Sequence, residues 1–365
     1  MDNYNFSVDG IKYWDIGQGS YLTDGKAGMS SGKSVTERLF SFFARANYSY
    51  QDKYMLSASI RHEGSSKFAA DNRWANFWSA TAGWRISNEE FMKDFDWLDD
   101  LKIRFGYGVT GNNDFSATYM ANMLGSDTNW MMPNGTWAYS YGKSQNVNPN
   151  LGWEEKKEWN LGVDYSFFEG RLYGKFDYYR REVDNLLFSV KVPQPPYTQG
   201  SQMQNIGSME SKGWEFEVGG DIIRTKDFTW SSSMNLSHNT GKILTLEGDN
   251  SYHNGNGFVA PGTPGDAARM EAGSTIGSFY MWKFAGFDDE GSFLLYNKDG
   301  EVIPAAQKTE NDKQYIGNYT PKLIIGWSHT LTYKNFDLGI NLRSWIDFDV
   351  YNTINICLLY TSPSP

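Results

Sequence analysis

Four carboxylates stand near one another in pairs. Glu215 and Glu217 are two residues apart, and Asp164 and Asp177 lie on consecutive segments that are expected to be neighbouring strands. Paired carboxylates can perform general acid–base chemistry. Here cations share the same segments, so ion pairing is favoured over catalysis; these cations are Lys102, Arg104, Lys175 and Arg181. No further group completes a catalytic constellation, and we predict that the protein is not an enzyme.

Metal and cofactor sites are not indicated. The four histidines, His62, His238, His253 and His329, are scattered, and no His/Cys cluster has ligand spacing. Residues 296–301 (YNKDGE) loosely resemble a calcium loop, but Leu295 stands where the first Asp is needed. Asp-Gly in a β-hairpin turn explains this segment better, and a second turn at 288–291 predicts a small hairpin.

Aromatic residues in two long connections are the candidates for ligand contact. Aromatic faces stack on sugar rings and on peptide side chains. The alternative, that these residues pack the loops together or against a partner protein, stays open. The first connection holds Trp130, Trp137, Tyr139 and Tyr141, and the second holds Tyr280 and Trp282.

The composition narrows the class of protein. The 365 residues carry a net charge of -10, which disfavours nucleic acid as a partner. A single Cys excludes a disulfide scaffold, and 16% aromatic residues disfavour disorder. No apolar stretch approaches the roughly 20 residues of a spanning helix. The mean hydropathy of -0.57 is typical of a soluble protein, but a transmembrane β-barrel also has low hydropathy because apolar and polar residues alternate.

Alternation with period two dominates the chain. Residues 40–50 place Phe40, Phe42, Ala44, Ala46, Tyr48 and Tyr50 on one face of a strand. About ten segments share this pattern: 40–50, 54–61, 78–86, 101–109, 159–167, 172–181, 214–222, 228–237, 323–333 and 336–343. Their apolar rows contain no Asp, Glu, Lys or Arg, and aromatic residues stand at the row ends, as in the aromatic girdles of membrane barrels. A soluble sandwich would also exclude charge from its core.

The fold class predicted from this pattern is all-β: a transmembrane antiparallel β-barrel with long extracellular loops. Short connections (51–53, 168–171, 224–227, 334–335) alternate with long ones (64–73, 111–154, 185–213, 241–321), and a helical turn is expected at 88–94. The polar rows should face the barrel lumen and hydrate it. They contain Arg45, Arg61, Arg85, Lys102, Arg104, Asp164, Lys175, Asp177, Glu215 and Glu217.

Several segments resemble the SusC/RagA-like TonB-dependent transporters of the Bacteroidetes outer membrane. They are 52–61 (DKYMLSASIR), 64–68 (GSSKF), 79–87 (SATAGWRIS), 107–112 (YGVTGN), 148–154 (NPNLGWE), 205–209 (NIGSM), 213–216 (GWEF) and 315–318 (YIGN). The resemblance covers most of the chain in the expected order.

The resemblance implies a barrel of about 22 strands whose lumen is filled by an N-terminal plug. It further implies outer-membrane import of an oligosaccharide or a peptide, energised by the TonB–ExbB–ExbD complex and assisted by a SusD-like surface lipoprotein, with outer-membrane lipid around the barrel. No cofactor is implied. A soluble β-rich surface glycan-binding module is the alternative from another class.

The same resemblance sets the expected domain limits. Residues 1–356 are expected to be part of a barrel that starts mid-barrel without the plug. Residues 357–365, which include Cys357, match nothing in the family and resemble a translated sequencing adapter, so we expect them to be an artefact.

Overall fold

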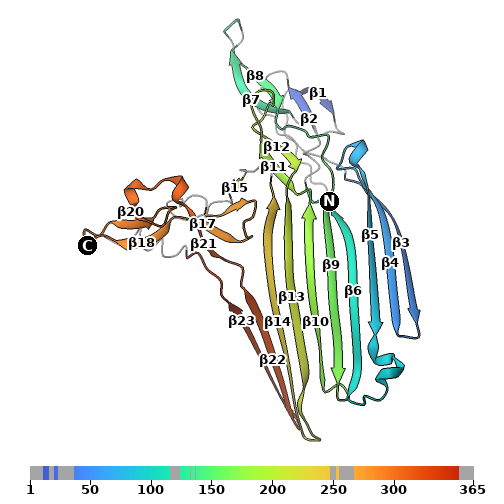
Figure 1. Cartoon of the computed structure of the whole chain (residues 1–365). Coiled ribbons are helices and arrows are strands. Elements are labelled where there is room, and N and C mark those ends of the chain that lie inside the picture. Colours follow the sequence, from blue (N-terminus) through green and yellow to red (C-terminus); the bar gives the residue numbers. More distant parts are fainter. Residues whose placement is uncertain are drawn as a thin grey trace.

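One long antiparallel sheet dominates the structure, a computed structural model that describes residues 11–15, 20–23, 37–115, 124–131, 133–135, 137–246, 252–254 and 267–352. Each long strand pairs with the next long strand of the chain (Figure 1). The ten strands are β3 (Leu39–Tyr50), β4 (Tyr54–Ser65), β5 (Trp74–Arg85), β6 (Leu98–Asn112), β9 (Glu154–Phe167), β10 (Leu172–Asp184), β13 (Ser208–Arg224), β14 (Phe228–Thr245), β22 (Leu323–Tyr333) and β23 (Phe336–Ile346). The predicted strands are therefore confirmed. Within the described part of the chain the sheet is open, because β3 and β23 each have a neighbour on one side only.

Several strands are longer than the alternation predicts. β13 has 17 residues and β14 has 18, and β14 continues to Thr245, whereas the apolar pattern ends near Ser237. The backbone ladder needs no apolar side chains to continue, so hydrogen bonding carries the strands past the point where the pattern changes.

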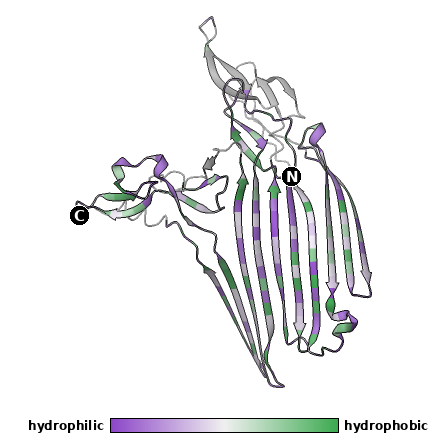
Figure 2. Ribbon diagram, viewed as in Figure 1, coloured by the Kyte–Doolittle hydropathy of each residue, from purple (hydrophilic) through white to green (hydrophobic). Residues whose placement is uncertain are grey.

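The two faces of the sheet differ in chemistry, as the banding along the strands in Figure 2 shows. On the face that we call the apolar face, large side chains are exposed: Phe42 is 60% exposed, Leu56 53%, Phe105 49%, Leu161 43% and Leu338 56%. A contiguous exposed apolar surface of this kind marks contact with an apolar environment. The other face, the polar face, carries the charged rows.

The short connections and the connection of intermediate length between β5 and β6 lie at one end of the sheet, and the long connections lie at the other (Figure 1). Gln51 and Asp52 adopt left-handed φ angles of 49° and 53°, which allows a three-residue turn between β3 and β4. The expected helical turn is instead two short 3₁₀ turns, η2 (Ile86–Asn88) and η3 (Glu90–Met92). No helix in the described ranges is long and apolar enough to cross a membrane.

The long connections fold into small sheets. They comprise β1 (Ile11–Asp15) with β2 (Ser20–Thr23), β7 (Leu124–Met131) with β8 (Trp137–Lys143), β11 (Leu187–Lys191) with β12 (Ser201–Asn205), β15 (Tyr252–Asn254) with β16 (Arg269–Glu271), β17 (Ser278–Met281) with β21 (Gln314–Asn318), and β18 (Lys283–Phe287) with β19 (Phe293–Tyr296) and β20 (Val302–Pro304). Three 3₁₀ turns accompany them: η1 (Ala70–Asn72), η5 (Ala305–Gln307) and η6 (Glu310–Asp312). The β18–β20 sheet confirms the hairpin predicted from the turns at 288–291 and 297–300.

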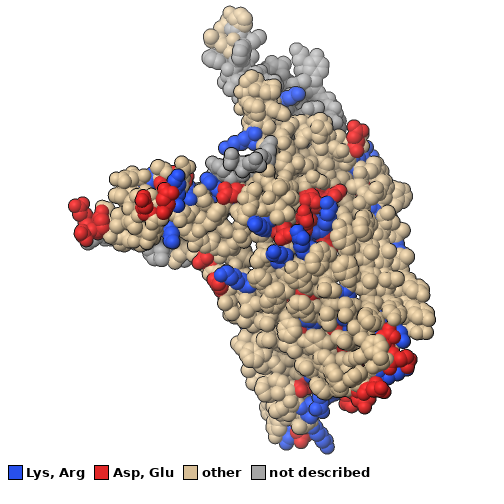
Figure 3. Space-filling view, viewed as in Figure 1, with Lys and Arg blue, Asp and Glu red and all other residues tan. Residues whose placement is uncertain are grey.

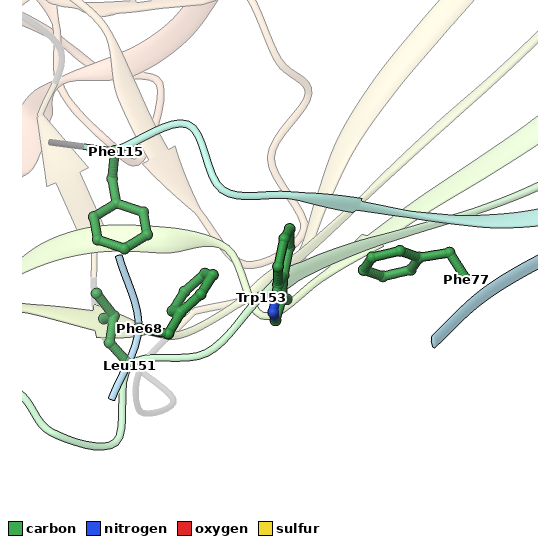
Figure 4. Packing of buried hydrophobic residues seen from close by; sticks show 5 residues of the cluster. All are labelled: Phe68, Phe77, Phe115, Leu151 and Trp153. Atoms are coloured by element: carbon green, nitrogen blue, oxygen red, sulfur yellow. The ribbon is translucent and has the colours of Figure 1, made fainter. Parts of the chain in front are cut away.

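A compact apolar core lies where the loops meet the ends of the central strands (Figure 4). The rings of Phe68 and Trp153 are 4.9 Å apart, and those of Phe77 and Trp153 are 5.4 Å apart. Phe115 and Leu151 complete the cluster, and Leu151 is only 1% exposed. Three segments distant in sequence are thereby fastened to one another.

Candidate functional site: the charged face and the loops above it

The polar face brings most of the predicted charged residues into direct register. Lys102, Asp164, Lys175 and Glu217 stand opposite one another across β6, β9, β10 and β13. Charges therefore alternate along this row, and the Lys175 Nζ lies 3.0 Å from a Glu217 carboxylate oxygen. Residues up to 115 positions apart in the chain form this one row.

Arg104 joins two of the predicted acids. Its Nε and Nη2 donate to the Asp164 carboxylate at 2.7 and 2.8 Å, and Nη2 also lies 3.2 Å from Asp177. The guanidinium must cross β9 at Gly162, where a Cβ atom would come within 2.6 Å of both Arg104 Nη2 and Asp177 Oδ1. A methyl group at this position would therefore displace the guanidinium or the Asp177 carboxylate from the two-carboxylate contact. We call Arg104, Gly162, Asp164 and Asp177 the arginine clamp.

The remaining predicted charges have different surroundings. Arg85 lies 3.2 Å from Asp100, Arg61 pairs with the buried Glu63, and Arg45 lies 5.6 Å from the Phe43 ring. Lys102 and Glu215 form no ion pair within the described residues.

One expected pairing is wrong. We expected Arg181 and Lys102 to pair with the acids at 164, 177, 215 and 217, but Arg181 instead lies 2.9 Å from Glu158. The register explains the difference, because Arg181 stands directly opposite Glu158 on β9. Strand pairing decides between acids that the sequence alone cannot rank.

The first set of aromatic ligand candidates lies on the β7–β8 hairpin. Trp137, Tyr139 and Tyr141 occupy alternate positions of β8. Trp130 of β7 pairs with Ala138, which lies between Trp137 and Tyr139 on β8. Their side chains lie outside the described residues. The backbone brings these four positions together, and their contact with a ligand stays a prediction.

Tyr280, in the second set, contacts an arginine of its own loop. The Arg269 guanidinium lies 4.0 Å from the Tyr280 ring centroid, and its Nη1 donates to the Tyr280 hydroxyl at 2.9 Å. The Tyr315 ring lies 5.1 Å away, edge to face. Burial, followed by a hydrogen bond to Glu271, raises the pKa of Tyr315. This aromatic group holds β16, β17 and β21 together.

Trp282 is similarly engaged within its own loop. Its indole Nε1 donates to the Thr309 carbonyl at 2.8 Å. The ammonium groups of Lys308 and Lys313 lie 4.5 and 4.4 Å from its ring centroids. These contacts support the alternative of loop packing for Trp282 and leave less of its ring available to a ligand.

Sequence reasoning missed three asparagines that join the long loops. Asn146 Nδ2 donates to the carbonyls of Gln199 and Ser201 at 2.6 and 2.9 Å. Asn205 both accepts from the Gly152 N–H at 2.7 Å and donates to its carbonyl at 2.9 Å. Asn148 donates to the Met203 carbonyl at 3.0 Å. Such amide-to-backbone bonds leave no periodic signal, although Asn148 and Asn205 lie within the segments 148–154 and 205–209 that carry the family resemblance.

Sequence reasoning also missed Glu89, at the opposite end of the sheet. Its carboxylate accepts hydrogen bonds from the Tyr54 hydroxyl at 2.6 Å, the Trp84 indole at 3.1 Å and Lys53 at 3.1 Å. These bonds, the Tyr54 bond first, lower the pKa of Glu89. One turn residue thus fastens the lower ends of β4 and β5. In the described part of the chain, no three His, Cys, Asp or Glu side chains are grouped to hold a metal ion.

Comparison with known proteins identifies the family. Residues 2–352 match the family model described as TonB dependent receptor-like, beta-barrel. The chain is 34% identical over 340 residues to TonB-dependent receptor SusC of Bacteroides thetaiotaomicron. The aligned region covers 90% of this chain and 33% of SusC. It is 33% identical over 339 residues to TonB-dependent receptor P3 of Formosa agariphila, and this aligned region covers 86% of this chain and 32% of the P3 receptor. The chain therefore spans about a third of the length of these relatives.

Solved structures agree with this relationship. The structure of the RagAB peptide transporter has a TM-score of 0.72 at 28% identity, covering 84% of this chain and 33% of that chain. The RagAB peptide importer in the open-open state has a TM-score of 0.74 at 26% identity, and the superposition covers 88% of this chain and 35% of that chain. The predicted fold class is thus confirmed as part of a TonB-dependent barrel, and this family consists of transporters and receptors and not of enzymes. The chain belongs to the TonB-dependent receptor β-barrel family and is a homologue of the SusC/RagA-like transporters.

Proposed function

We propose that the protein carrying this chain imports a nutrient, an oligosaccharide or a peptide, across the outer membrane in a TonB-dependent manner. The observation that carries the proposal is the single sheet with one exposed apolar face and one charged face. An apolar row facing lipid and a polar row facing a lumen are what a membrane barrel requires. TonB-dependent receptors are outer-membrane proteins, and similarity to SusC and RagAB supports the same location here.

The partners follow from the same family. We propose that a SusD-like surface lipoprotein sits over the long-loop end and that a TonB–ExbB–ExbD complex energises import from the other side. The hydrogen bonds of Asn146, Asn148 and Asn205 hold the long loops in one arrangement, which supports a defined surface for the lipoprotein at this end. The charged polar face, with Lys102 and Glu215 unpaired among the described residues, supports contact with a plug that fills the lumen.

The limits of the barrel segment are also proposals. We propose that residues 1–356 belong to the barrel and that 357–365 are a sequencing-adapter artefact. Residues 353–365 lie outside the described residues.

Fractionation tests the location. The intact receptor should appear in the outer-membrane fraction and migrate anomalously in gels when unheated, because barrels stay folded in detergent. Recovery in the aqueous fraction without detergent would support instead the alternative of a soluble glycan-binding module. A soluble module would not explain why the sheet exposes large apolar side chains on one face.

Uptake tests the substrate. A strain lacking the receptor gene should lose uptake of either labelled oligosaccharides or labelled peptides, and collapse of the proton gradient should abolish the same uptake. The similarity to RagAB, a peptide transporter, favours peptides, and the loop aromatics suit either class. Unchanged uptake of both classes would refute the import proposal.

A further inference from the structure

A belt of charge crosses the apolar face above its upper aromatic row. The aromatic row runs over neighbouring strands, with ring contacts of 5.1 Å between Trp78 and Tyr107 and 5.5 Å between Trp159 and Tyr178. Beyond this row the long strands continue, and side chains on the same face become charged. Figure 3 shows these charges gathered over the upper ends of the central strands, within a broad uncharged area.

The sign of the charge changes with distance from the apolar surface. In the first row, Trp159, Arg180 and Lys212 stand directly opposite one another on β9, β10 and β13. The second row mixes both signs and contains Lys157, Glu182, Glu210 and Lys242. The charged residues of the third row are both acids, Glu155 and Asp184. The positive charges of Arg180 and Lys212, which we call the basic pair, therefore lie nearest the apolar surface.

One carboxylate holds the basic pair in place. Glu210 lies 2.6 Å from Arg180 and 3.8 Å from the Lys212 Nζ, and only 12% of its side chain is exposed. Arg180 and Lys212 are 46% and 55% exposed, and Glu182 is 4.0 Å from Arg180. The two cations thus share Glu210, only Arg180 also reaches Glu182, and about half of each cationic side chain remains exposed to an outside ligand.

From this arrangement we propose that Arg180 and Lys212 bind the phosphate of a lipid in the outer leaflet, with its acyl chain lying on Leu161, Tyr178 and Trp214. A lipid phosphate sits at the boundary of the hydrocarbon, which is where the pair stands relative to the apolar surface. Arginine and lysine are the side chains that bind phosphate, and such contacts strengthen where water is partly excluded. The acids of the third row lie farther out, and the two acids of the second row, Glu182 and Glu210, are balanced by Lys157 and Lys242 of the same row, so the basic pair leaves this part of the face positive. This inference depends on the membrane location proposed above.

Lipid retention by the intact receptor tests the site. The receptor is purified in neutral detergent, incubated with phosphatidic acid or with diacylglycerol of the same acyl chains, and bound lipid is counted by native mass spectrometry. We expect retention of phosphatidic acid over diacylglycerol, and a loss of affinity of about tenfold or more in Arg180→Gln/Lys212→Gln, since bonds to charged groups are lost. Lys175→Gln/Arg181→Gln removes the same charge from the polar face and should leave lipid retention unchanged.

Each other outcome counts against the site. Equal retention of the two lipids, unchanged retention by the Arg180/Lys212 variant, or equal loss in the polar-face control would refute it. Displacement of the lipid by millimolar inorganic phosphate alone would show an ion site instead. Anomalous migration in gels verifies folding of each variant, and Arg180→Lys/Lys212→Arg should retain phosphatidic acid. Failure of the location test would be seen separately, as receptor absent from the membrane fraction.

Discussion

The sheet and the loop region bury their apolar residues in opposite ways. In the loop region Phe68 is 2% exposed and lies inside a ring cluster, whereas Phe42 of the sheet is 60% exposed on the apolar face. The sheet keeps its charges on the other face, where the arginine clamp and the Lys175–Glu217 pair lie. One chain thus combines a loop region that buries its apolar residues with a sheet that exposes them on one face, as contact with an apolar environment requires.

The largest expected effect comes from truncating the loop core. Phe68→Ala should destabilise the loop region by about 3–5 kcal/mol, because the cavity is enclosed by Phe115, Leu151 and Trp153. The same truncation at Phe42 should cost much less, because lipid fills the space. Hydrogen exchange of the loop amides for Phe68→Ala, and of the β3 amides for Phe42→Ala, measures the two losses in the intact receptor. Equal losses at the two sites would break the distinction between the regions.

A charge on the apolar face should have the next largest effect. Leu236→Arg places a cation midway along β14, in register with Phe216 and Ile325, and should cost about 2–4 kcal/mol in a bilayer. Its neighbour Ser237 lies on the polar face, and Ser237→Arg should change stability by less than about 0.5 kcal/mol. Urea unfolding in lipid vesicles compares the two variants. If Ser237→Arg were the more damaging, the assignment of the faces would be reversed.

Disturbing the arginine clamp should have an intermediate effect. Gly162→Ala puts a Cβ atom within 2.6 Å of Arg104 Nη2 and Asp177 Oδ1, so these groups must move apart, and the lost hydrogen bonds should cost about 0.5–1.5 kcal/mol. Gly106→Ala on β6 is a matched control, since its nearest contact would be an ordinary 3.4 Å to Thr81. Thermal unfolding in detergent separates the two glycines, and equal midpoints would show that the clamp contributes nothing to stability.

The smallest effect is a pH dependence confined to the loops. Hydrogen bonds from the Thr309 hydroxyl and N–H lower the pKa of Asp312 below its ordinary 3.8. Its ionised form therefore stabilises the η6 turn above that pH, and the contribution is lost as pH falls through the lowered pKa. Asp312→Asn should raise proteolytic cleavage near η6 at neutral pH and weaken its acid dependence, whereas Asp289→Asn, at an exposed turn, should change neither. A variant as resistant as the parent would show that the turn does not depend on this carboxylate.

Much of the sheet was predictable because alternation is a local property. The apolar rows through Phe40, Leu161 and Leu338 are visible in the residues themselves, and each indicated a strand that the structure contains. Strand ends were less predictable, since β14 continues through Lys242 on hydrogen bonds that leave no pattern in side-chain type. The pairing of Arg181 was mispredicted because a choice between Glu158 and other acids depends on register.

The loop region was predictable only in part. Its turns at 288–291 and 297–300 were visible because Asp-Gly favours tight turns, but the joining of two long loops by Asn146 and Asn205 was not. The assembly of Phe68, Phe115 and Trp153 into one core was equally invisible, because these residues are far apart and follow no period.

The sequence by itself determined that this protein is a sheet with one apolar and one charged face, since strand geometry converts alternation directly into faces. Tertiary structure alone decided which charged residues stand opposite one another. Examples are the row from Lys102 to Glu217, the passage of Arg104 over Gly162, and the basic pair beside Trp159. These contacts join strands distant in the chain, and their register follows from the whole ladder of backbone hydrogen bonds rather than from any local run of residues.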